Sequence, residues 1–143
     1  MNRLQKIAWS VVITISAGFV VSCIAVAILY VKVGMPKAVA GFALIGIAGL
    51  GGLGPLIFKK DKGKVSFDER DRQIKEKAAL GGFAAAFLFA GLACMIPFFI
   101  LGPKASISVT WLPNIWMGTF LTAFFVYSAA ILIQYGWKGG DNE

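Results

Sequence analysis

The hydrophobic residues of this chain are gathered into four long runs, which polar segments separate. The runs cover approximately residues 7–31, 38–58, 78–101 and 112–135, and none of them contains Asp, Glu, Lys or Arg. Each run is long enough to cross a bilayer as a helix, which needs about 20 residues. None alternates between apolar and polar positions, as the strands of a membrane barrel do. The pattern predicts an all-α fold, an integral membrane four-helix bundle formed as a single domain by residues 1–143.

The composition of the chain also indicates a membrane protein. The chain is 58% hydrophobic and only 15% charged, whereas soluble domains are about 45–50% apolar and about 25% charged. A net charge of +7 would favour nucleic acid in a soluble protein. Here the basic residues lie beside the ends of the runs, where they orient helices and attract anionic lipid headgroups. We therefore expect the lipid bilayer around the chain and no nucleic-acid partner.

The distribution of Lys and Arg predicts the orientation of the helices. Eleven of the 14 lie before the first run, between the second and third, or after the fourth; the other three are Lys32, Lys37 and Lys104. Because cytoplasmic segments are enriched in Lys and Arg, both termini and residues 59–77 are expected in the cytoplasm. The expected location is the inner membrane of a prokaryotic cell, which the chain crosses several times.

The first run also has features of a cleaved leader. Basic residues precede it, and Val20–Cys23 resembles the lipobox of bacterial lipoproteins. The apolar run continues to Tyr30, however, so we expect an uncleaved first helix.

The charged segment 66–77 predicts where the third helix begins. Ser66 followed by Glu69 is a capping box, and no residue between Glu69 and Leu80 interrupts a helix. We expect this helix to begin near Phe67 and to enter the bilayer without a break. At about 1.5 Å per residue, a helix of roughly 33–35 residues is about 50 Å long. Two to three of its turns would then project into the cytoplasm, beyond a hydrocarbon core of about 30 Å.

The same segment contains the candidate partner-binding residues. Asp68–Arg72 and Asp71–Lys75 have the spacing of i,i+4 ion pairs, which stabilise a helix by about 0.2–0.5 kcal/mol each. Asp71 also lies on an apolar stripe with Ile74, so it either pairs with a nearby lysine or meets a basic residue of another chain. The candidate residues are Asp68, Arg70, Asp71, Arg72 and Lys75.

One motif in this segment resembles that of a known group of proteins. The pattern Asp68-Glu69-Arg70-Asp71-x-x-Ile74-x-x-Lys77-Ala78, placed between two pairs of apolar helices, is similar to a motif at the start of the third helix in a family of small, uncharacterised bacterial and archaeal four-helix membrane proteins. The resemblance covers about a dozen residues and the order of the helices. It implies a four-helix membrane fold, and it implies no activity and no catalytic residues.

Small residues in the third run predict a close helix contact. They form an i+4 ridge that starts after Ile74 and consists of Ala78, Gly82, Ala86 and Ala90, followed by Cys94. Ridges of this kind let helix backbones approach closely within lipid. The partner is either another helix of the same chain or, in a homodimer, a second copy.

The second run ends in a glycine-rich segment, residues 49–54. It matches G-x-G-x-x-G, but no strand precedes it, so a nucleotide site is not expected. Gly49 and Gly52 are candidates for helix packing, with Pro55 kinking the end of the helix. The alternative is a broken helix that lines an ion or substrate site.

The chain lacks several features typical of enzymes and coupled transporters. The chain has no His, so the usual general base and the commonest metal ligand are absent. Cys23 and Cys94 do not form a C-x-x-C motif, although they could meet if the first and third helices pack together. Proton- or ion-coupled transporters usually require an acidic residue within the membrane. No Asp or Glu lies within the four runs. We expect no cofactor, no metal and no catalytic residue.

These observations favour a non-enzymatic membrane protein. We expect an interaction or regulatory protein, or an accessory subunit, that presents residues 66–77 to a protein partner. The alternative is a small homo-oligomeric transporter or channel that uses the glycine-rich second helix.

Overall fold

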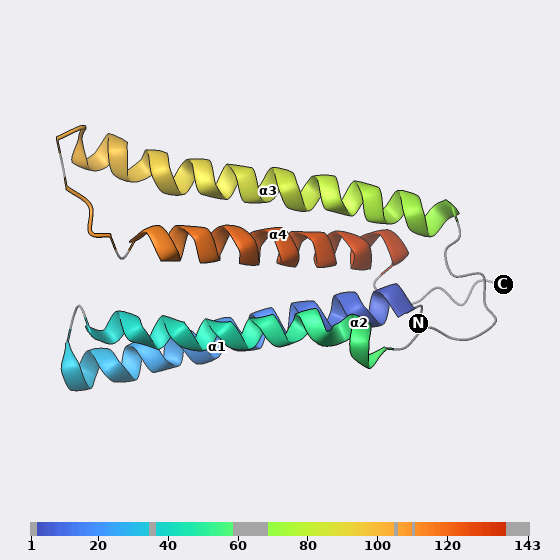
Figure 1. Cartoon of the computed structure of the whole chain (residues 1–143), viewed down its shortest axis with the longest axis horizontal. Helices are drawn as coiled ribbons and strands as arrows, with labels where there is room; N and C mark the ends of the chain where they lie inside the picture. The colour runs from blue at the N-terminus through green and yellow to red at the C-terminus, as the bar shows by residue number, and fades with distance from the viewer. Residues whose placement is uncertain (1–2, 35–36, 59–68, 105, 110, 137–143) are drawn as a thin grey trace. The chain divides into compact units, whose positions relative to one another are not determined.

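The computed structural model describes residues 3–34, 37–58, 69–104, 106–109 and 111–136. All regular structure in these residues is helical (Figure 1), which confirms the all-α prediction. The elements are α1 (Arg3–Val33), η1 (Lys37–Leu53), α2 (Gly54–Ile57), α3 (Glu69–Leu101) and α4 (Trp111–Tyr135). Since α2 follows η1 directly, the two form one second helix, so four helices coincide with the four hydrophobic runs.

The helices stop where the sequence supplies glycine. Gly34, Gly102 and Gly136 directly follow α1, α3 and α4, and all three have positive φ, between 71° and 80°. This left-handed conformation ends a helix. It lets the glycine N–H donate a hydrogen bond to one of the last carbonyls of that helix. The Gly34 N–H donates to the Tyr30 carbonyl at 3.1 Å, and the Gly102 N–H to the Phe98 carbonyl at 3.0 Å.

The second helix differs from the sequence expectation in its type. All 17 residues of η1 are a 3₁₀-helix, and only the last turn, α2, is α-helical. A 3₁₀-helix has three residues per turn, so side chains at i and i+3 lie in line. Most buried residues of η1 follow this spacing: Ala38 and Gly41 are three positions apart, as are Ile45, Ala48 and Gly51, with one step of four between Gly41 and Ile45.

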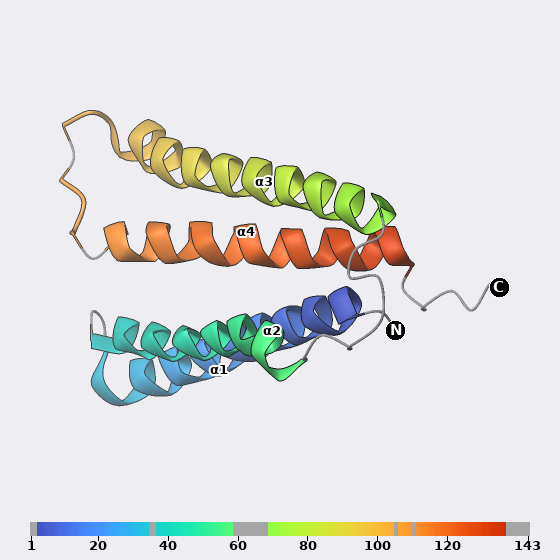
Figure 2. The ribbon, with the colours of Figure 1, turned by 45° about the vertical axis from the view of Figure 1, so that its right-hand side comes forward.

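The chain forms two compact units, the first built on α1, η1 and α2 and the second on α3 and α4. In the first, the second helix runs antiparallel to α1 (Figures 1 and 2). Its small residues lie close to α1: Gly41 at Val26, Ala48 at Gly18 and Gly51 at Val11 meet the backbone, and Gly54 meets the Ser10 hydroxyl. A Cβ on Gly41 would lie 2.7 Å from the Val26 nitrogen, and one on Gly51 would lie 3.0 Å from the Val11 Cα.

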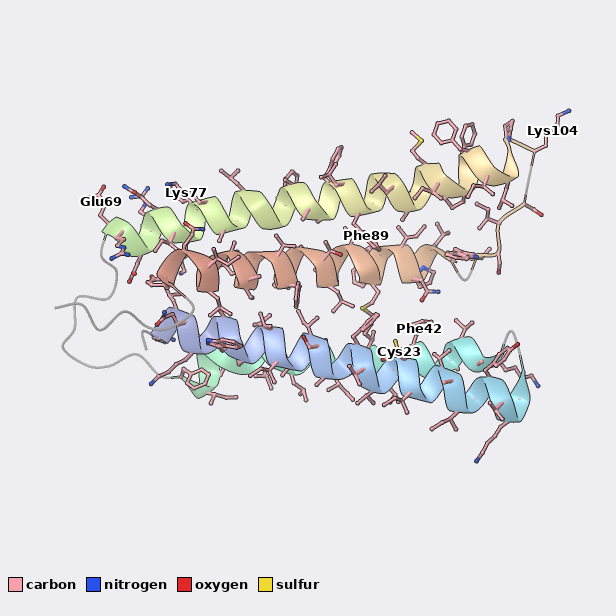
Figure 3. All side chains as sticks on the ribbon, turned by 180° about the vertical axis from the view of Figure 1, so that it is seen from behind. Cys23, Phe42, Glu69, Lys77, Phe89 and Lys104 are labelled. Atoms are coloured by element: carbon pink, nitrogen blue, oxygen red, sulfur yellow. The ribbon has the colours of Figure 1, made fainter. Side chains whose placement is uncertain are left out.

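The second unit is an antiparallel pair in which glycines again mark the close contacts (Figure 2). A Cβ on Gly82 of α3 would lie 2.8 Å from the Ala123 carbonyl oxygen of α4. Further along, the Phe89 ring lies over Gly118, where a Cβ would come within 2.6 Å of it; Figure 3 shows Phe89 between the two helices. In this register, the Ile74 turn of α3 is level with the last turns of α4.

Four hydroxyl groups on the apolar helices are bonded to carbonyls of their own helix. Ser10 donates to the Ile7 carbonyl and Thr14 to the Ser10 carbonyl, both at 2.8 Å. On α4, Thr119 and Thr122 donate to the carbonyls of Ile115 and Gly118, also at 2.8 Å. Back-bonding of this kind satisfies a hydroxyl without water or a second helix.

Candidate functional site

The first turns of α3 have two different sides. Ile74 and Ala78 are buried, and Asp71 and Lys75 beside them are half-buried. The exposed residues form the other side: Glu69, Arg70, Arg72, Gln73, Glu76 and Lys77. Figure 3 shows Glu69 and Lys77 at this charged end of α3, with Lys104 beyond the opposite end. We call the exposed residues between Glu69 and Lys77 the stem surface.

The stem surface contains an ion pair between Arg72 and Glu76. Arg72 Nε donates to Glu76 Oε1 at 3.0 Å, and 78% and 61% of the two side chains are exposed. Arg72 thus pairs with a residue one turn later, whereas the sequence analysis expected Asp68, which lies outside the described residues together with Ser66 and Phe67. Exposed i,i+4 pairs contribute only about 0.3–0.5 kcal/mol. The pair therefore restricts the conformations of two side chains but contributes little to the stability of the fold.

The half-buried side of the stem contains the two other predicted residues. Asp71 and Lys75 lie on the same stripe as Ile74 and Ala78, as the spacing predicts. Both take part in interactions in the structure. Because they are half-covered and engaged, they are less accessible to a partner than the exposed residues of the stem surface.

Two cations of the stem surface have no partner among the described residues. Arg70 and Lys77 are both exposed, and neither takes part in an ion pair or hydrogen bond within the described part of the chain. They are seven residues apart, so they lie on one side of the helix about 10.5 Å from each other along its axis. A row of two unpaired cations is complementary to acidic groups.

The small-residue ridge of α3 lies along its buried side. Ala78, Gly82 and Ala86 are buried, Ala90 is half-buried and Cys94 is exposed. The helix that approaches Gly82 is α4 of the same chain, through the Ala123 backbone. At this position the close contact is therefore made within the chain.

The glycines of the second helix are divided between two sides. Gly41, Gly51 and Gly54 are buried against α1. Gly49 and Gly52, the predicted packing residues, are exposed, and a Cβ at either would meet no described atom within 4 Å. In an α-helix, the side that contains Ile45 would continue through Gly49 and Gly52. With three residues per turn it continues through Gly51 instead, and only an i+3 template could have found this.

A hydrogen bond joins the two ends of the first unit. Arg3 Nε, in the first turn of α1, donates to the Phe58 carbonyl directly after α2, at 2.6 Å. The carbonyls at the end of a helix lack intrahelical donors and carry partial negative charge, so a guanidinium is a suitable cap there. Sequence reasoning treated Arg3 only as an orienting charge.

Other chemistry-bearing groups do not cluster. No group of three or more His, Cys, Asp or Glu that could hold a metal is found in the part of the chain that the structure describes. Cys23 and Cys94 are free thiols, and both are exposed.

The comparisons with known proteins add no relative. No protein-family description, no curated protein and no solved structure matches this chain. The motif at residues 68–78 therefore stands as a local resemblance.

Proposed function

We propose that this chain is a four-crossing membrane protein without enzymatic activity, which binds a protein partner through the stem surface. It would act as an interaction or regulatory protein, or as an accessory subunit of a larger assembly. The proposal depends on two properties of the chain, the apolar surface of its helices and the location of its exposed charges.

The apolar surface supports residence in a bilayer. Three helices, α1, α3 and α4, are long and apolar enough to cross a membrane. Large side chains on them are exposed, including Leu80, Phe83 and Phe87 at 71–72%. Contiguous apolar surface of this extent is rare on soluble monomers. Lipid is the solvent that suits it.

The second helix supplies the fourth crossing. At about 2.0 Å per residue, the 17 residues of η1 extend about 34 Å, and α2 adds about 6 Å. This exceeds a hydrocarbon core of about 30 Å. Four crossings would put both termini on one side, together with the stem surface, and the excess of Lys and Arg favours the cytoplasm as that side. We propose the inner membrane of a prokaryotic cell as the location.

The location of charge is the observation that carries the proposed function. The four runs contain no Asp, Glu, Lys or Arg, whereas Glu69, Arg70, Arg72, Glu76 and Lys77 are all exposed on the stem surface. Exposed charges set the specificity and the rate of association between proteins. With Arg70 and Lys77 unpaired in the described structure, the partner that fits is an acidic protein surface.

Charge reversal of the two unpaired cations tests the proposal. The variant R70E/K77E would be purified from its host in mild detergent, and the proteins retained with it would be compared with those of the natural chain. We expect retention of the partner to fall about tenfold or more, because like charges would then face each other. The matched control K104E changes an exposed lysine at the other end of α3 and should retain the partner. Equal retention by all three proteins would contradict the proposal.

A transporter or channel built on the second helix is the second candidate function. Gly46, Gly49 and Gly52 support it, because they leave one side of η1 without large side chains and open to a second copy or a solute. Purified protein in liposomes should then move solute, and substitution of Gly49 and Gly52 by Leu should change the flux. Absence of any flux, together with loss of the partner in R70E/K77E, would favour the first function.

A further inference from the structure

The second helix contains a long 3₁₀-helix, a geometry that needs stabilising contacts from outside the helix. Stretches of 3₁₀-helix longer than three or four residues are uncommon, because their hydrogen bonds are poorly aligned and their side chains eclipse. Here the stretch is 17 residues long. Contacts outside the helix must therefore favour this form over the α-helix.

The structure shows two such contacts. Along the helix, Gly51 and Gly54 fit against α1 at a spacing of three residues, which only 3₁₀ geometry keeps in line. At the end of the helix, the Phe58 carbonyl is held by Arg3. The first contact selects the period of the helix, and the second fixes its length.

The length explains why the bond to Arg3 matters. Residues 37–57 extend about 40 Å as observed but would extend only about 32 Å as a continuous α-helix. From the same outer turn at Gly34, an α-helical second helix would end about 8 Å short of its present position. The Phe58 carbonyl could then no longer accept a hydrogen bond from Arg3.

The interface between α1 and the second helix also contains a buried polar group. Ser22 lies one turn from Gly18 and one turn from Val26, both of which contact the second helix. Its side chain is 0% exposed, and its hydroxyl has no hydrogen-bond partner in the described structure. Strain is one explanation for an unsatisfied buried group.

We infer that the second helix is a length-adjustable element, held in its extended 3₁₀ form by the Arg3–Phe58 hydrogen bond. When that bond breaks, the helix shortens to the α form, and its end withdraws from the first turn of α1. The shortening also moves Gly51 and Gly54 off the side that faces α1. This gives the first unit two states of different length, independently of any partner of the stem surface.

Distances between spin labels test the inference in the full chain, in liposomes, with Cys23 and Cys94 replaced by Ala. Ala40 and Leu53 are exposed on η1 and 13 positions apart, so labels there should be separated by about 26 Å along a 3₁₀-helix and about 20 Å along an α-helix. Ala17 and Tyr30 are a pair of equal spacing on α1, and they should stay near 20 Å throughout.

The decisive comparison is between R3A and K6A. We expect the distance between positions 40 and 53 to shorten by about 6 Å in R3A and to remain long in K6A, which removes an equal charge one turn further along α1. A distance near 20 Å in the natural sequence would overturn the inference, because the helix would already be α-helical. An unchanged long distance in R3A would overturn it as well, because the helix would then not be adjustable.

Discussion

Single glycines decide which side of the second helix can approach α1. Gly51 and Gly52 are neighbours in the sequence, but only Gly51 lies against another helix. The difference follows from three residues per turn, and α-helical periodicity would favour Gly52. A substitution at each position therefore reports the helix type directly.

We expect G51A to destabilise the protein by about 1–3 kcal/mol, the usual cost of overpacking. Its new Cβ would meet the Thr14 hydroxyl and lie 3.0 Å from the Val11 Cα, neither of which can yield easily. G52A should be neutral or slightly stabilising, since it gains helix propensity without a contact. Thermal unfolding midpoints in one detergent would measure both. Greater loss in G52A would show that the helix has α-helical periodicity.

The adjacent glycines of α3 provide a second pair. G82A should cost about 1–3 kcal/mol, because its Cβ would lie 2.8 Å from the Ala123 carbonyl oxygen, a backbone atom. G81A should have little effect, since no described atom lies within 4 Å of its Cβ. The same unfolding measurement compares them. Equal unfolding midpoints for G81A and G82A would show that α3 and α4 are not in close contact at Gly82.

At the scale of elements, regular α-helices were predictable and the 3₁₀-helix was not. The i+4 spacing of Ala78, Gly82 and Ala86 places them on one side of α3 because α3 is a regular α-helix. The ends of three helices could also be predicted, since a glycine directly follows each of them. The type of the second helix depends on contacts with α1 and on Arg3, which lies 55 positions from Phe58. No local pattern contains that information.

The stem of α3 should be stable without its visible ion pair. Both Arg72 and Glu76 are mostly exposed, so R72A/E76A should change the free energy of unfolding by less than about 0.5 kcal/mol. The exchange R72E/E76R restores a pair in the more favourable acid-first order and should be at least as stable as the natural chain. Chemical unfolding followed by circular dichroism would measure both variants. A loss above about 1 kcal/mol in the exchange variant would mean that Arg72 has a structural contact beyond this pair.

At the scale of the whole molecule, the central claim is that the chain crosses the membrane four times. Three helices are long and apolar enough to cross, and the fourth crossing depends on whether the second helix, residues 37–57, also spans the hydrocarbon core. If η1 did not cross, α3 and α4 would be inverted, and the stem surface would lie outside the cell. The function proposed for the stem surface therefore depends on this one helix.

Accessibility of single cysteines at positions 32, 73 and 104 tests the claim most directly. Each would replace an exposed residue, Lys32, Gln73 or Lys104, in a chain whose own cysteines are changed to Ala. Labelling of intact cells with a membrane-impermeant maleimide should modify positions 32 and 104 and leave position 73 unmodified until the membrane is opened. Modification of positions 32 and 73 together, with position 104 protected, would show three crossings and contradict the account.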